Sequence, residues 1–415
     1  MSPRSPRPPE LERALRSFHE GNEDETLRWL LKAQESNPDL APAEVMLATM
    51  YLTNDRAAAG RQVLERAVLQ HPLDPEPHLI FGDLGWQERR VSDAFLQYQR
   101  GYELAKDFAG SADRKRQLQV RALAGLGTIA ETRRQHDQAV KYFEQLVSIN
   151  PEHSQAHFRL GNLLFALGRP NEALVQFEAA AQTSTDAPDP RLTLAQLYQQ
   201  HGNTEETSRW LQQAIDQTPN SPTPRLAMAR WLLQIANDET EATAHLDGAE
   251  QVGASAADVG LLRGLIAWKQ GDLTRAEKHL EPVAIADPQN TPANCSLASV
   301  LAEQAGEDQQ KRAWELIQLV AAKSPQSADI ITTAGWVAYR IGQWDIAEQN
   351  LRRAAEISPR DRDVHYYLAR SLYRHGHIAD ARQHLEQALK LPGLFIHESS
   401  ARQFLRELDR DGGSP

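Results

Sequence analysis

A glycine pattern that suits a dinucleotide phosphate occurs at residues 125–130, which read Gly-Leu-Gly-Thr-Ile-Ala. In nucleotide-binding proteins this pattern follows a strand and opens a helix, so that backbone amides meet the phosphates. Here the segment lies well inside a stretch with helical periodicity. We therefore predict that Gly127 packs two helices together, and we expect no cofactor.

The single cysteine, Cys295, is the next candidate for chemistry. One cysteine excludes an intrachain disulfide framework and any zinc or iron–sulfur site built from several cysteines. No His or Asp stands at a spacing that would place it beside this thiol. Residues 294–296 also form a glycosylation sequon, but they fall within the same predicted helix. We predict a small, half-buried residue rather than a nucleophile.

Four histidines cluster near the C-terminus, and metal binding is the chemistry to consider for His365, His375, His377 and His384. A metal site needs an i, i+4 pair on a helix or a preformed pocket. His375 and His377 instead flank Gly376, which reads as a turn, and the sequence predicts turn and solvent positions. No phosphate loop, nucleophile elbow or HExxH pattern occurs. We expect no metal and no enzymatic activity.

The elements that must position any functional residue follow a period of 34 residues. Prolines that end amphipathic segments lie 34 apart at Pro38 and Pro72, and again at Pro325 and Pro359. Eleven units fit this period, and each has a small residue at its eighth position. These are Ala14, Ala48, Gly82, Gly127, Gly161, Ala195, Ala229, Gly264, Ala298, Gly335 and Ala369. Small residues let two antiparallel helices of one unit approach closely.

These units resemble the tetratricopeptide repeat, whose length is also 34 residues. Two near-consensus examples are residues 154–184 (SQAHFRLGNLLFALGRPNEALVQFEAAAQTS) and residues 328–359. The resemblance covers residues 7–395. It implies an all-α fold, a right-handed α-solenoid of about eleven repeats, each with a helix A and a helix B.

The predicted boundaries divide the chain into six parts. Residues 1–6 are a disordered tail, residues 7–106 hold repeats 1–3, and residues 107–119 are an insertion that extends the next helix. Residues 120–395 hold repeats 4–11, residues 396–410 form a capping helix, and residues 411–415 are a second tail. Repeats 7 and 9 are expected to have longer loops between their helices, and Pro282 is expected to kink or restart its helix.

Composition limits the range of partners. Lys and Arg number 45 against 56 Asp and Glu, giving a net charge of −11, which argues against nucleic acid. No apolar run approaches the roughly 20 residues of a membrane helix. No apolar stretch follows the residues 1–9, so we expect a cytoplasmic protein as the sequence stands, and a periplasmic or envelope protein if the native N-terminus is missing. A monomer is favoured.

By resemblance, ligands lie against helix A, at repeat positions 2, 5, 9, 12 and 13, which share one helical face. The sequence places aromatic residues there among arginines, types that dominate binding hot spots. The predicted partner-binding residues are Trp336, Tyr339, Arg340, Tyr366, Arg370, Tyr373, Arg374, Phe158 and Asn162. The alternative is that Trp336 and Tyr366 pack between A helices while the arginines pair with Asp345, Asp363 or Asp380.

Two functions are compatible with these patterns. The first is a non-catalytic scaffold whose groove holds a protein or peptide segment that is acidic or rich in aromatic residues. The second is an accessory subunit of a bacterial envelope or exopolysaccharide export system, which residues 365–408 resemble loosely. The carboxylate clamp of chaperone-binding repeats is not present, because Phe158 stands where that clamp has lysine and Thr193 where it has asparagine.

Overall fold

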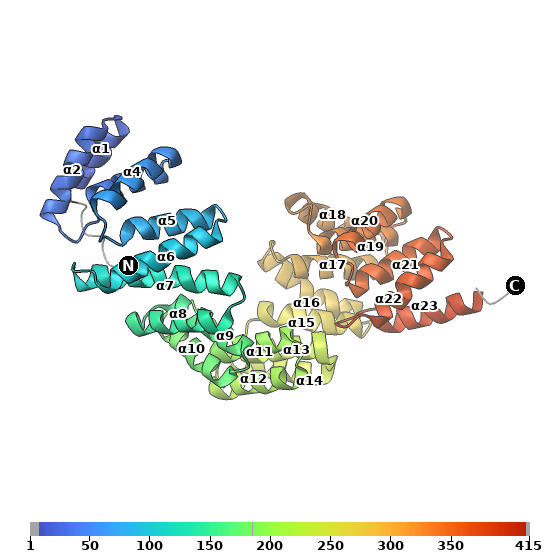
Figure 1. Ribbon diagram of the computed structural model, residues 1–415. Helices are drawn as coiled ribbons and strands as arrows, with labels where there is room; N and C mark the ends of the chain where they lie inside the picture. The colour runs from blue at the N-terminus through green and yellow to red at the C-terminus, as the bar shows by residue number, and fades with distance from the viewer. Residues whose placement is uncertain (1–7, 185, 412–415) are drawn as a thin grey trace. The chain divides into compact units, whose positions relative to one another are not determined.

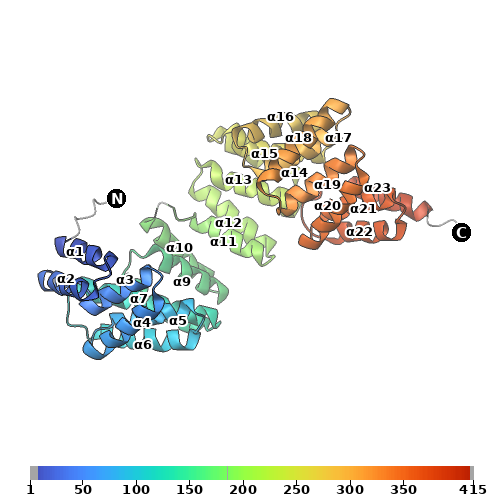
Figure 2. The ribbon, with the colours of Figure 1, turned by 90° about the horizontal axis from the view of Figure 1, so that it is seen from above.

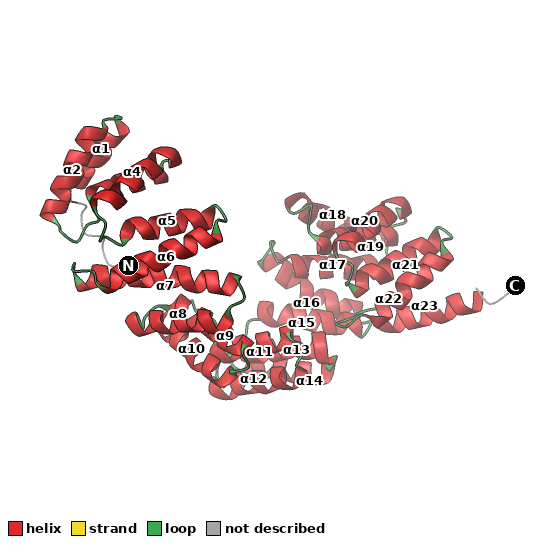
Figure 3. Cartoon of the chain, viewed as in Figure 1, coloured by secondary structure: helices red, strands yellow, loops and turns green. Residues whose placement is uncertain are grey.

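The computed structural model describes residues 8–184 and 186–411, and in that part of the chain every regular element is a helix (Figures 1 and 3). The chain divides into two compact units, residues 1–193 and 194–415, with the boundary inside α11 (Pro190–Gln200). In each unit, helices that follow one another in the sequence pack as antiparallel pairs. The expected two-helix repeat is therefore present in both units.

The first unit holds five helix pairs before α11. Their bounds are α1 (Pro9–His19), α2 (Glu23–Ser36), α3 (Ala43–Thr53), α4 (Ala57–Gln70), α5 (Glu76–Gln87), α6 (Val91–Lys106), α7 (Ala112–Thr132), α8 (His136–Ile149), α9 (Ser154–Ala166) and α10 (Pro170–Thr183).

The second unit continues the alternation and ends in an additional helix. Its elements after α11 are α12 (Thr204–Gln217), α13 (Pro222–Trp231), the π-helix η1 (Leu232–Ala236), α14 (Glu239–Gln251), α15 (Ala256–Lys269), α16 (Leu273–Ala286), α17 (Thr291–Glu303), α18 (Glu307–Lys323), α19 (Ala328–Arg340), α20 (Trp344–Ile357), α21 (Arg362–Arg374), α22 (Ile378–Lys390) and α23 (Glu398–Asp411). The A helices α17, α19 and α21 lie side by side (Figure 2).

The turn between helices A and B depends on glycine in several repeats. Gly168 and Gly376 have φ of +74° and +83°, a left-handed conformation that other L-residues adopt at a cost. Polar side chains begin many helices, as where Asn22 and Asn203 accept the backbone N–H three residues ahead. These local signals fix where each helix starts and stops.

The crossing of the two helices in a repeat depends on the small residue at position eight. A Cβ atom built on Gly161 would lie 2.5 Å from Cε1 of Phe177, and one on Gly127 would lie 2.7 Å from Cζ of Phe143. Both phenylalanines are buried. The dinucleotide-like pattern at residues 125–130 is thus part of α7, where Gly127 makes room for an aromatic ring.

Gly161→Leu should lower the free energy of unfolding of the first unit by roughly 1–3 kcal/mol or more, because overpacking forces α9 and α10 apart. Ala166→Leu, an exposed position on the same helix, is the matched control. Hydrogen exchange should show lost protection first in α8–α10, since each repeat depends mainly on its neighbours. Equal loss of protection in every helix of the unit would contradict this expectation.

The insertions differ in part from their expected form. Residues 107–111 form a loop, the side chain of Ser111 accepts the N–H of Arg114, and α7 runs for 21 residues. The expected long loop of repeat 7 is wrong, because the extra residue is absorbed by η1 before Asn237, whose φ is +58°. The expected long loop of repeat 9 is also wrong, because the extra residues of that repeat lengthen α18. Helix α16 continues through Pro282.

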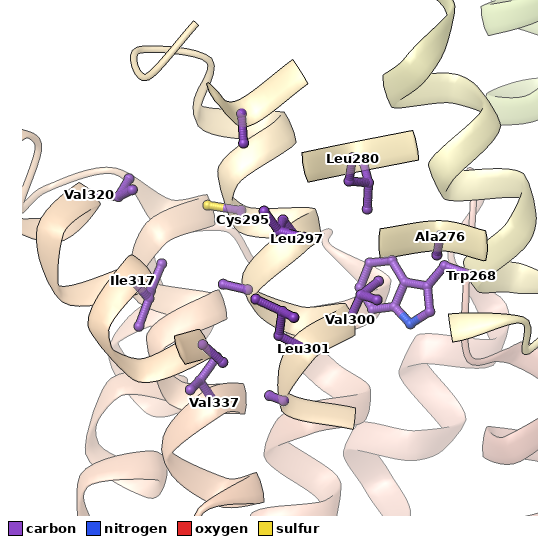
Figure 4. Packing of buried hydrophobic residues seen from close by; sticks show 14 of the residues in the cluster. Trp268, Ala276, Leu280, Cys295, Leu297, Val300, Leu301, Ile317, Val320 and Val337 are labelled. Carbon is purple, nitrogen blue, oxygen red and sulfur yellow. The ribbon is translucent and has the colours of Figure 1, made fainter. Parts of the chain in front are cut away.

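The C-terminal end contains an element that the repeat pattern does not describe. Residues 391–397, here called the groove segment, join α22 to α23 without forming a helix. Phe395, Ile396 and His397 are buried, and Ile396 belongs to a core cluster formed mainly by residues of α15–α19, part of which Figure 4 shows. The predicted capping helix corresponds to α23. The predicted tails, apart from Asp411, lie outside the described residues.

Candidate functional site

The site is built on the A helices of the last four repeats, α15, α17, α19 and α21. At its centre is Glu303, the last residue of α17. The indole Nε1 of Trp268 donates a hydrogen bond of 2.9 Å to one carboxylate oxygen, and Nε1 of Trp336 donates one of 2.9 Å to the other. The imidazole Nε2 of His397 lies 3.2 Å from Oε1. Three different repeats and the groove segment therefore meet at one carboxylate.

The environment of Glu303 favours its ionised form. Burial by itself would raise the pKa of this carboxyl, but the hydrogen bonds from His397, Trp268 and Trp336 and the charge of His397 outweigh burial and lower it. Both indole rings are buried, and buried N–H groups in native proteins are nearly always hydrogen-bonded. Among the described residues, the carboxylate of Glu303 is the acceptor for both of them.

Aromatic rings surround the imidazole of His397. The ring stacks on Tyr366 with a centroid distance of 5.0 Å and an interplanar angle of 22°. It meets Trp268 edge-on at 5.6 Å, and the hydroxyl of Tyr367 lies 3.1 Å from Nε2. Trp336 stacks in turn on Tyr367 at 4.2 Å. The groove segment is therefore held in place by both polar and aromatic contacts.

A hollow of about 290 Å³ opens beside this network, between the A helices and α23. We call it the arginine hollow, and it is lined by Glu303, Trp336, Arg340, Tyr366, Arg370, His397, Ser400, Gln403, Phe404 and Glu407. Four of the predicted partner-binding residues are in its wall. Trp336 and Tyr366 are buried beneath the groove segment and α23, so only part of each ring faces the hollow.

The two arginines of the hollow have different surroundings. Arg340 lies over the Trp336 ring and donates to the backbone carbonyls of Ala302 and Glu303, at 3.2 Å each. Arg370 lies 4.7 Å from the centroid of the Phe404 ring. Among the described residues, its guanidinium has no hydrogen-bond acceptor and no carboxylate partner. Arg370 is therefore a charged donor of this hollow that remains available to a ligand.

The other predicted residues of α19 and α21 lie around this hollow. Tyr339 is half-buried and stacks on Trp336 at 5.3 Å. Tyr373 meets Phe404 edge-on at 5.2 Å, and Arg374 lies over the exposed Trp344 at 4.1 Å. In the described chain none of the arginines at positions 340, 370 and 374 pairs with Asp345, Asp363 or Asp380. The packing alternative is therefore wrong for those ion pairs, while Trp336 and Tyr366 do pack between helices.

The remaining two predicted residues belong to the first unit. Phe158 is half-buried on α9, with its ring 5.4 Å from that of Phe177. Asn162, one turn further along, is also half-buried. The neighbouring Arg159 pairs with Glu131 and donates to Thr128, so the charge on this face is already compensated.

The residues that suggested other chemistry have ordinary structural surroundings. Cys295 is buried, and burial raises the pKa of its thiol to about 11, which suppresses the thiolate. His365 and His384 contact each other, with 2.9 Å between their Nδ1 atoms, so the prediction of solvent positions is wrong for these two. His375 pairs with Glu348 instead. Within the described ranges, no three His, Cys, Asp or Glu side chains are grouped as a metal site would require.

None of the described helices is both long enough and apolar enough to span a membrane.

Two sequence profiles, both described as tetratricopeptide repeat, match the chain. One matches residues 45–111, 124–190 and 332–393, and the other matches residues 164–233, so that together they cover more than half of the 415 residues. This chain belongs to the tetratricopeptide repeat family. Its eleven small-residue positions are the helix crossings of that repeat.

The similar protein sequence matches a short part of this tetratricopeptide repeat protein, whereas similar solved structures align with nearly all of it at low identity. A TPR repeat-containing protein of Pseudomonas aeruginosa is 34% identical over 113 residues, which is 27% of this chain and 19% of that protein. Among solved structures, yeast Tom70 covers 97% of this chain at 12% identity, 95% of its own chain being aligned, with a TM-score of 0.38. The Cut9–Hcn1 structure of the APC/C covers 96% of this chain, and 95% of its own chain is aligned, at 12% identity and a TM-score of 0.43. None of these similarities bears on what this chain binds.

Sequence reasoning missed the two residues at the centre of the site, Glu303 and His397. A signal for Glu303 existed, because it occupies position 13 of repeat 9, the position that Arg340 and Arg374 hold in the next two repeats. His397 had no comparable signal, since it lies beyond the last repeat. Its apolar neighbours Leu394, Phe395 and Ile396 were the only indication that this segment is buried.

Proposed function

We propose that this tetratricopeptide repeat protein is a non-catalytic scaffold that binds a segment of a partner protein in the arginine hollow, and that the segment carries acidic or aromatic residues. The observation that carries the proposal is the guanidinium of Arg370, which lies over Phe404 with its donors unused by any described residue. An arginine held against an aromatic ring is pre-organised to donate two parallel hydrogen bonds to a carboxylate.

Neighbouring residues would extend the contact beyond one carboxylate. Arg340 adds a second positive charge to the hollow, and the half-buried ring of Tyr339 offers apolar surface beside it. Tyr373 and Arg374 continue the same helix toward its end, so a segment of several residues would reach them. Phe158 and Asn162 provide a separate neutral surface on the first unit. Glu303 and Glu407 also line the hollow, so the attraction for an acidic segment would come from Arg370, whose charge has no carboxylate partner among the described residues.

Peptide selection followed by measured affinity tests this function. A displayed library of random peptides is selected on the full chain, and the enriched peptides are synthesised and measured by fluorescence anisotropy. We expect enrichment of Asp, Glu and aromatic residues, and affinity that falls as salt is raised. Replacing both Arg340 and Arg370 by glutamine should weaken binding at least about tenfold, because each lost charged hydrogen bond is worth roughly 1.5–3 kcal/mol.

The matched control replaces Arg352 and Arg382 by glutamine. Both are exposed arginines on B helices, and both pair with a glutamate four residues away in sequence. The control removes the same total charge, so it should leave peptide affinity within about twofold of the unaltered chain. Equal affinity of both double variants for acidic peptides, or selection of peptides without acidic and aromatic residues, would count against the arginine hollow as the site.

A further inference from the structure

A second hollow, of about 160 Å³, lies on the same A helices, and the ionisable groups of its wall are mainly carboxylates. We call it the aspartate pocket, because Asp329, Asp361 and Asp363 all contribute to its wall. Asp329 lies in the first turn of α19. Asp361 and Asp363 lie at the start of α21, where Asp361 caps the helix by accepting the N–H of Asp363 at 2.9 Å.

Within residues 8–184 and 186–411, none of these three carboxylates takes part in an ion pair with lysine or arginine. Arg362, the nearest arginine in sequence, donates instead to the carbonyls of Ala388 and Gly393 and lies over Phe395. The pocket therefore holds three carboxylates that lack a direct ion-pair partner, and only the more distant charges of His397 and Arg362 act on Asp363.

Asp363 provides an observation that is independent of the grouping of the three carboxylates. Its carboxylate oxygen Oδ1 is inaccessible to solvent and has no hydrogen-bond partner, although native proteins satisfy most such atoms. Burial raises the pKa of Asp363 to about 7, and the nearby charge of Asp361 and Glu303 adds to this, while His397 and Arg362 oppose it. The pKa of Asp329 is also raised, first by burial and then by Asp361. A bound positive charge would relieve both carboxyls.

The rest of the wall suits a cation with a hydrocarbon stem. Leu265, Trp268, Leu394 and Ile396 provide apolar surface. The hydroxyl of Thr332 donates to the carbonyl of Ala328 at 2.8 Å, which leaves its lone pairs free to accept a hydrogen bond from a ligand. A bare metal ion fits poorly, because no three ligating side chains are grouped in the described part of the chain.

We propose that the aspartate pocket binds an organic cation, an alkylammonium or alkylguanidinium group, with its charge against Asp361 and Asp363 and its stem on the apolar wall. Two sources share this chemistry. One is a free diamine or polyamine, and the other is a lysine or arginine side chain of a partner segment, which alone rests on the proposed function above.

The experiment uses the full chain at pH 8 and titrates it with agmatine and with spermidine in a calorimeter. N-acetylputrescine, which has a single ammonium group and therefore two fewer than spermidine, and magnesium chloride at equal ionic strength are the comparison probes. A saturable heat with agmatine or spermidine is expected. Asp363→Asn should weaken it at least tenfold, and Asp380→Asn, an exposed carboxylate on α22, should not change it.

Peptides with a single lysine, and the same peptides with that lysine acetylated, separate the two sources. Binding of the free amines assigns the pocket to small cations, whereas binding only of the lysine peptide, lost on acetylation and in Asp363→Asn, assigns it to a partner side chain. No saturable binding of either, equal competition by magnesium chloride, or unchanged affinity in Asp363→Asn overturns the proposal. Failure of the Arg340 and Arg370 variants to alter acidic-peptide binding concerns only the arginine hollow.

Discussion

Replacing Glu303 by alanine should lower the free energy of unfolding of the second unit by about 3–5 kcal/mol, the range for removing one partner of a buried charged network. The loss is large because the indole N–H groups of Trp268 and Trp336 are both left without an acceptor, and the imidazole of His397 loses its carboxylate. Urea denaturation followed by tryptophan fluorescence measures the change. The same variant should release the groove segment, which hydrogen exchange at residues 391–397 would report.

Two further variants make this expectation specific. Glu315→Ala removes an exposed carboxylate of α18, whose nearest cation is Lys311 at 3.9 Å, and should cost well under 1 kcal/mol. Glu303→Gln keeps one acceptor oxygen and should fall between the two. Because the pKa of Glu303 is lowered, its contribution is present above the ordinary carboxyl pKa and is lost as pH falls through the folded value. If Glu303→Ala proved as stable as Glu315→Ala, the network would have no role in stability.

Asp363→Asn should change stability in the opposite direction to Glu303→Ala. We expect it to raise the free energy of unfolding at pH 8 by up to about 4 kcal/mol. The pKa of Asp363 is raised to about 7 in the folded chain, against roughly 3.9 when unfolded, and each pH unit of difference is worth about 1.4 kcal/mol. The folded state binds the proton of Asp363 more tightly than the unfolded state does. The contribution of this carboxyl to the free energy of unfolding is therefore greatest below pH 4 and declines as pH rises to 7. The difference in free energy of unfolding between Asp363→Asn and the unaltered chain should therefore grow from pH 4 to pH 7 and stay constant above pH 7.

The measurement is urea denaturation of the unaltered chain, Asp363→Asn and Asp380→Asn between pH 5 and pH 8, without amines. The charged groups that act on Asp363 are Asp361, Glu303, His397 and Arg362, so the comparison between variants matters more than either curve alone. Asp380→Asn should follow the unaltered chain throughout. A difference that is constant from pH 5 to pH 8, or that shrinks as pH rises, would show that Asp363 is not held with a raised pKa.

The repeat architecture could be predicted from sequence because it rests on contacts between neighbours in the chain. Gly161 and Phe177 lie half a repeat apart, and their requirement for close packing recurs every 34 residues. The insertion in repeat 7 was harder to interpret, because an extra residue can lengthen a loop or widen a helical turn. In the structure the extra residue widens a helical turn, the π-helix η1 that begins at Leu232. The choice depends on the packing of α13 against α14, which the sequence pattern does not show.

The site was predicted only where it obeys the period. Arg340 and Arg370 were predicted because the resemblance to the repeat family implies that repeat positions 9 and 13 face the ligand side of helix A, and the structure places both in the wall of the arginine hollow. Their aromatic neighbours Trp336 and Tyr366 were placed on the right face, but the sequence did not show that the groove segment would cover them. The groove segment covers these rings because His397 contacts Trp268 and Glu303, which precede it by 129 and 94 residues in the sequence. A local sequence pattern cannot predict contacts between residues so far apart in the chain.

The groove segment also sets the length of this array. Repeats of this kind are modular, and an array can usually gain or lose a unit because each unit recognises only the next one. Here His397 reaches back from the end of repeat 11 to Glu303 in repeat 9 and Trp268 in repeat 8. Duplicating or deleting a unit between them would move the imidazole by one repeat and separate it from its carboxylate. The last four repeats are therefore not interchangeable, unlike typical repeats of this family, and they form a unit of fixed size.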